Sequence, residues 1–108
     1  MDARELCARL DRGELVVMTA HEFAKVEPHL TLEHTHDTGL AGPIHVLRTT
    51  GGAAVLEFPP RLEQGVARPL AELDAAEAFV RARLAAYERM WDGCGACRPD
   101  YFAPPDPR

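Results

Sequence analysis

A change of hydrophobic period around Pro59 and Pro60 constrains the fold of this chain more than any other feature. Before these prolines, residues 26–36 alternate between apolar and polar side chains, a period of two that is typical of a β-strand with one polar face. After them, apolar residues recur at helical spacing from Leu70 to Trp91. The two periods predict a sheet in the middle of the chain and a long helix that lies across one face of it.

Three further short segments, rich in Val, Ile, Leu or Ala, are predicted to be strands. They span residues 15–18, 44–50 and 53–58. Gly51 and Gly52 predict a two-residue hairpin turn between the last two segments, because both positions tolerate positive φ. Residues 61–69 contain a glycine and mixed charges, and they are predicted to be a linker between the sheet and the long helix.

An N-terminal helix is predicted from about Ala3 to Arg12. Asp2 and Glu5 have the spacing of a capping box, and Gly13 is suited to end the helix. Together the elements predict an α+β fold: an N-terminal helix, an antiparallel β-meander of about three or four strands, and a long C-terminal helix packed on one sheet face.

The composition of the chain indicates one globular domain. It has 108 residues, of which 46% are hydrophobic and 27% charged. We expect a single α+β domain over residues 1–97 and a proline-rich extended tail over residues 98–108. The formal net charge of −5 argues against nucleic acid or an anionic membrane surface as a partner. No stretch approaches the roughly 18 apolar residues of a membrane-spanning helix, and no signal peptide is recognised, so a cytoplasmic location is expected.

The two-residue hairpin turn predicts a register for the strands on either side of it. It pairs Thr50 with Ala53 and Leu47 with Leu56. The more apolar face of this hairpin then carries Leu47, Ala54, Leu56, Phe58 and His45. If the preceding strand places Leu32 opposite Leu47, three histidines gather at one end of this face, with His34 opposite His45 and with His36 one step further along.

A C-x-x-C pair, Cys94 and Cys97, follows the long helix and is the strongest candidate for chemistry. Thiolate and imidazole ligands together suit zinc, which prefers four tetrahedral ligands. We therefore predict a zinc site formed by Cys94 and Cys97 with any of His34, His36 or His45.

Several alternatives stay open for the cysteine pair. Two chains could each donate Cys94 and Cys97 to a four-cysteine zinc or iron–sulfur site across a twofold axis. A thiol–disulfide redox role is disfavoured because the pair follows a helix C-terminus, where the partial negative charge raises the pKa of a thiol. The cysteines could also be buried turn residues of an interaction module, which would dock a partner or a second copy through the long helix or the aromatic tail with Trp91, Tyr101 and Phe102.

The leading hypothesis from the sequence is a small, non-enzymatic, zinc-binding protein. The chain contains no serine, which excludes a serine nucleophile, and Gly51 with Gly52 is far from a phosphate-binding glycine loop. The charged residues of the long helix fit a solvated surface. No catalytic residue is therefore predicted. The predicted metal ligands are Cys94, Cys97, His34, His36 and His45.

Overall fold

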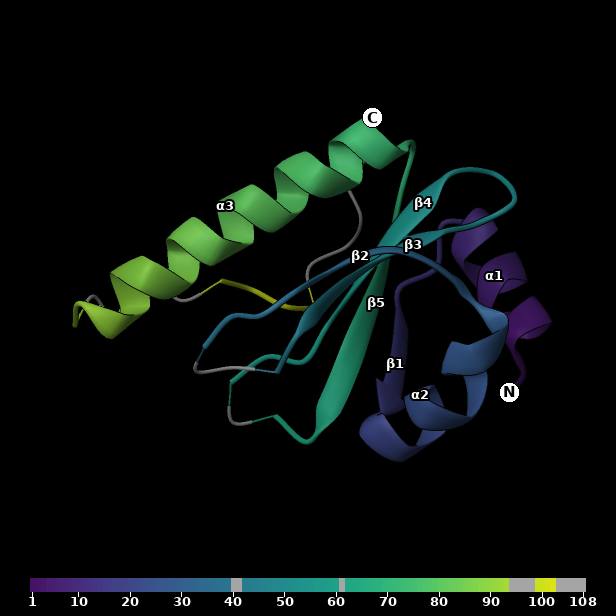
Figure 1. The fold of residues 1–108 in the computed structure, drawn as a ribbon, viewed down its shortest axis with the longest axis horizontal. Coiled ribbons are helices and arrows are strands. Elements are labelled where there is room, and N and C mark those ends of the chain that lie inside the picture. The colour runs from purple at the N-terminus through teal and green to yellow at the C-terminus, as the bar shows by residue number, and fades with distance from the viewer. Residues whose placement is uncertain (40–41, 61, 94–98, 103–108) are drawn as a thin grey trace.

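A computed structural model describes residues 1–39, 42–60, 62–93 and 99–102. In this part of the chain, five strands form one antiparallel sheet in the order β1-β5-β4-β3-β2. Figure 1 shows α3 along one face of the sheet and α1 with α2 on the other face. The elements are α1 (Ala3–Asp11), β1 (Val16–Thr19), α2 (Ala20–Val26), the 3-10 helix η1 (Glu27–His29), β2 (Thr31–His36), β3 (Ile44–Arg48), β4 (Ala53–Glu57), β5 (Gln64–Leu70) and α3 (Leu73–Trp91). The predicted α+β fold is confirmed, with five strands in place of three or four.

Side-chain caps define the beginnings of the two N-terminal helices. The Asp2 carboxylate accepts a hydrogen bond from the backbone N–H of Glu5 at 2.8 Å, which satisfies one of the free donors in the first turn of α1. Thr19 and Glu22 form a reciprocal capping box at the start of α2. Both caps follow from the sequence, because a short polar side chain precedes Glu by three residues in each case.

β5 is the main correction to the predicted fold. It occupies most of the segment that was predicted to be a linker, and it lies between β4 and β1 in the sheet. Val66 and Ala67 are fully buried at its centre. The sequence pattern did not predict this strand because it contains Gly65, Arg68 and Pro69, and each of these residue types is uncommon in the interior of a sheet.

The hairpin of β3 and β4 has the predicted faces but a different register. Leu47 pairs with Ala54 rather than with Leu56, and the backbone N–H of Thr49 donates to the carbonyl of Gly52 at 3.0 Å. The loop is therefore longer than two residues. Because the shift in pairing is an even number of residues, every side chain keeps its predicted face.

Both faces of the sheet are covered by helices. The face toward α1 and α2 buries one apolar cluster, formed by Leu6, Leu10, Val16, Met18, Phe23, Val26, Leu47, Ala54, Leu56 and Ala67. The face toward α3 buries the other cluster, formed by Ile44, Val46, Ala53, Val55, Val66, Ala76, Val80, Tyr87 and Tyr101. No helix in the described ranges is both long and apolar enough to cross a membrane. The domain boundary predicted at residue 97 lies outside the described residues and stays a prediction.

Charged side chains are buried under α3 beside the second cluster. Arg83 donates to both carboxylate oxygens of Glu57, at 2.8 and 2.9 Å, and Glu57 is only 1% exposed. A guanidinium nitrogen of Arg68 donates to the backbone carbonyl of Tyr101 at 2.9 Å. These contacts fasten α3 and the segment 99–102 to β4 and β5.

Candidate metal site

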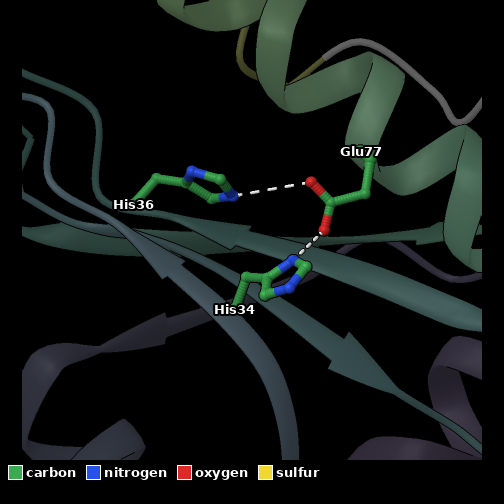
Figure 2. Close-up of side chains that lie close together, drawn as sticks. All are labelled: His34, His36 and Glu77. Carbon is green, nitrogen blue, oxygen red and sulfur yellow. Dashed lines mark hydrogen bonds and ion pairs between the residues drawn. The ribbon is translucent and has the colours of Figure 1, made fainter.

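His34 and His36 of β2 and Glu77 of α3 form the candidate functional site. Figure 2 shows both imidazoles pointing toward the Glu77 carboxylate, each reaching a different oxygen. Nδ1 of His34 contacts Oε1, and Nε2 of His36 lies 3.6 Å from Oε2. One ligand atom from each residue lies within 4.8 Å of the other two. Two segments that are far apart in the sequence therefore supply three metal-ligating groups to one place.

A β-bulge in β2 places the two histidines on this face. Leu32 pairs with Leu47 as predicted, but the register shifts after it, so that His34 pairs with Val46 and Thr35 pairs with His45. The extra residue at the bulge reverses the faces of all residues that follow it. His34 and His36 consequently face α3, on the sheet face opposite to the predicted one.

Glu77 reaches the histidines because of its position on α3. The buried side of this helix, which contacts the sheet, carries Ala76, Val80, Arg83 and Tyr87. Glu77 lies on the flank of that buried side, since successive residues of an α-helix are rotated by about 100°. Its side chain is only 23% exposed, against 58% for His34 and 32% for His36. The carboxylate is thus held close to the sheet while the imidazole of His34 stays open to solvent.

The most telling feature of the site is the Nε2 atom of His36. This nitrogen is buried and makes no hydrogen bond among the described residues, because Oε2 of Glu77, at 3.6 Å, is within ion-pair distance but too far for a hydrogen bond. A buried polar atom without a partner costs about 1–3 kcal/mol, and most such atoms in folded proteins are satisfied. A cation between the imidazoles and the carboxylate would satisfy this nitrogen.

The three groups suit a divalent transition-metal ion in their chemistry and nearly in their spacing. Two histidines and one glutamate are the protein ligands of one type of catalytic zinc site, which keeps a further position open. Ligands at about 2.1 Å from a tetrahedral ion lie about 3.4 Å apart. Small side-chain rotations that bring the nitrogens and a carboxylate oxygen together would complete such a site.

The predicted function, a zinc protein built on the C-x-x-C pair with nearby histidines, is wrong. Within the described residues, the group able to hold a metal ion combines two of the predicted histidines with a carboxylate and contains no cysteine. Cys94 and Cys97 themselves lie outside the described residues. Cys7 is the cysteine that the structure describes, and it is a free thiol whose pKa burial raises.

His45 does not join the other two histidines. The bulge leaves it on the opposite face, where its ring lies 4.9 Å from the ring of Phe23 and 6.4 Å from that of Phe58. Its Nδ1 shares a hydrogen bond of 3.0 Å with the Thr35 hydroxyl. Burial lowers the pKa of His45, so the imidazole is held neutral as part of the core.

Glu77 is the candidate site residue that the sequence interpretation missed. The acidic residues of the long helix were assigned to a solvated surface. One signal was present, however, because Glu77 occupies a position in the apolar stripe of that helix, between Leu73 and Val80. A carboxylate within an apolar stripe needs a polar partner, and the histidines of β2 provide it.

Comparison with known proteins adds no family to this description. No family model, no curated protein and no solved structure matches the chain.

Proposed function

We propose that this protein binds a divalent transition-metal ion, with zinc as the first candidate, through His34, His36 and Glu77. The observation that carries the proposal is the buried Nε2 of His36, which has no hydrogen-bond partner among the described residues and is directed at the Glu77 carboxylate. The site is unlike the cysteine-based site predicted from the sequence, because its ligands are imidazole and carboxylate and one of its histidines is largely exposed. Water or a solute can therefore reach the bound ion.

Metal binding at this site would join an edge strand to a helix. Among the described strands, β2 lies at the edge of the sheet and pairs with β3 alone. An ion held by β2 and α3 together adds a second connection for this strand. Because an ion that binds only the folded chain stabilises it by mass action, zinc at about 100 times its dissociation constant would add about 2.7 kcal/mol to the free energy of unfolding.

A hydrogen-bonded clasp without metal is the second candidate for these residues. The contact of His34 with one oxygen of Glu77 favours it, since a carboxylate can accept from an imidazole N–H. The two candidates differ in the response to metal. A clasp predicts that zinc leaves the stability of the protein unchanged.

Calorimetric titration of metal-free protein with zinc tests the proposal. Cys94 and Cys97 are first replaced by alanine, so that the C-x-x-C pair contributes nothing to the measured heat. We expect one ion per chain, and we expect His34→Ala, His36→Ala and Glu77→Gln each to weaken binding at least about tenfold, a loss of 1.4 kcal/mol. His21→Ala and His29→Ala are the matched controls, because both histidines are exposed and lie outside the site.

The outcome that contradicts metal binding is equally clear. If the protein with Cys94→Ala and Cys97→Ala takes up no zinc, or if the control variants lose as much affinity as the site variants, the three residues form no metal site.

Two wider predictions from the sequence also stay proposals. A cytoplasmic location suits a chain with three cysteines, because a reducing compartment keeps thiols free. A protein partner or a second copy at the C-terminal end of α3 is supported by the exposure of Trp91 and Phe102, at 40% and 49%. Solution mass measured over a range of concentrations tests the second copy.

A further inference from the structure

A cleft on the other flank of α3 is a second candidate site, independent of the histidines. It has a volume of about 820 Å³ and lies between the end of α1, the β3–β4 hairpin, the end of β5 and the first half of α3. Ligand sites of drug-sized molecules commonly fall between about 300 and 1,000 Å³. The cleft is therefore large enough for a ligand with one or two rings.

Small side chains of α3 create this space. Ala75, Ala78 and Ala82 line the cleft at helical spacing, on the side of α3 turned away from Glu77. Leu10, Leu70 and Phe79 supply larger apolar walls. The Phe79 ring is held in place by the guanidinium groups of Arg83 and Arg68, at 4.8 and 5.2 Å from its centre. An apolar ligand would thus meet both a pocket and a fixed aromatic ring.

The charged side chains that line the cleft are acidic. Among its described lining residues, Asp11 and Glu72 are the charged ones, and no lysine or arginine lines it. Asp11 is also fixed in place, because its Oδ1 accepts hydrogen bonds from the Thr49 hydroxyl at 2.7 Å and from the backbone N–H of Gly51 at 3.0 Å. The neighbouring Gly52 lets the hairpin approach the turn before α3 closely, since a Cβ added there would lie 2.6 Å from the carbonyl oxygen of Ala71.

We infer that this cleft binds an apolar cation, such as an aromatic or aliphatic amine. The apolar body of the ligand lies against Phe79 and the alanines of α3, and its positive group lies at the carboxylates of Asp11 and Glu72. The charge complementarity selects this class over fatty acids and other apolar anions, which the two carboxylates would repel.

Three related probes test the charge and the place of binding. They are 1-naphthylmethylammonium, the neutral 1-naphthylmethanol and the anionic 1-naphthoate, titrated into ¹⁵N-labelled protein and followed by amide chemical shifts. We expect the cation to bind about threefold or more tightly than the neutral probe, as one partly exposed charge contact would give, and the anion to bind most weakly. The largest shifts are expected at Gly13, Gly51, Ala75 and Ala78.

Two substitutions separate the cleft from the rest of the surface. Ala78→Leu fills the cleft from an exposed helix position and should weaken the cation at least fivefold, whereas Ala24→Leu, at an exposed position of α2, should not. Glu72→Gln should reduce the preference for the cation over the neutral probe. Equal binding of cation and anion, shifts centred away from the cleft, or unchanged binding to Ala78→Leu would each overturn the inference.

Discussion

Replacing Arg83 by methionine should cost about 3–5 kcal/mol of the free energy of unfolding, because a buried carboxylate loses its two charge-assisted hydrogen bonds and keeps the longer contact of 3.5 Å from the Tyr87 hydroxyl. Glu57 is 1% exposed and accepts two hydrogen bonds from Arg83, at 2.8 and 2.9 Å. The substitution also removes the guanidinium from the rings of Phe79 and Tyr101, which lie 4.8 and 5.0 Å away. Domains of this size have only about 5–15 kcal/mol of stability, so the loss is a large fraction of the total.

The pH dependence of this loss identifies its cause. Burial already raises the pKa of Glu57, and Arg83 is the strongest group that opposes the rise. Without Arg83 the pKa of the folded state rises further above the ordinary 4.5 of the unfolded chain, so the folded state takes up a proton first as the pH falls. The deficit of the variant relative to the parent should therefore shrink between pH 7 and pH 5.

Urea unfolding followed by circular dichroism measures these free energies at both pH values. Arg81→Met is the matched control, an exposed arginine on the same helix, and should change stability by less than about 0.5 kcal/mol. The double variant Glu57→Leu/Arg83→Met removes both charges of the pair and should recover part of the loss, because buried Arg68 then lacks the Glu57 carboxylate that favours its charge. A deficit below about 1 kcal/mol for Arg83→Met, or one that is the same at pH 7 and pH 5, would refute the reasoning.

Two further predictions concern the hairpin and the buried histidine. Gly52→Ala should lower the free energy of unfolding in urea by about 1–3 kcal/mol, because the new Cβ would lie 2.6 and 2.8 Å from the backbone oxygens of Ala71 and Leu70. Thr50→Ala, at an exposed position, is the control. Equal losses of stability in the two variants would contradict this explanation. His45→Phe should reduce the loss of thermal stability between pH 6.5 and pH 5. Burial lowers the pKa of His45 in the folded state, so the unfolded chain binds more protons in this window and the parent loses stability as the pH falls. Melting temperatures that change in parallel with pH in parent and variant would count against this prediction.

The parts of the fold that were predictable depend on neighbours in the sequence. The helix caps at Asp2 and Thr19 and the faces of the β3–β4 hairpin each follow from a few consecutive residues. The strand that was not predicted, β5, depends on contacts with residues that are distant in the sequence. β5 is flanked by β4 and by β1, and its Arg68 is buried with help from the carbonyl of Tyr101. A local sequence pattern cannot predict a strand when residues with low β-propensity are stabilised in it by contacts with distant parts of the chain.

The candidate site was only half predictable, and the reason is the bulge in β2. Regular pairing after Leu32 would have placed His34 and His36 beside His45, against the apolar cluster under α1 and α2. Burying two more imidazoles there would require partners that this cluster does not offer, and unsatisfied polar groups are costly. A bulge is readily accommodated here, because β2 is an edge strand whose outer backbone groups do not pair with another described strand. The same bulge turns both histidines toward Glu77. The register of β2 therefore depends on the residues that fill the two apolar clusters and not only on alternation along the strand. Which residues fill these clusters is known only once the positions of the helices are known.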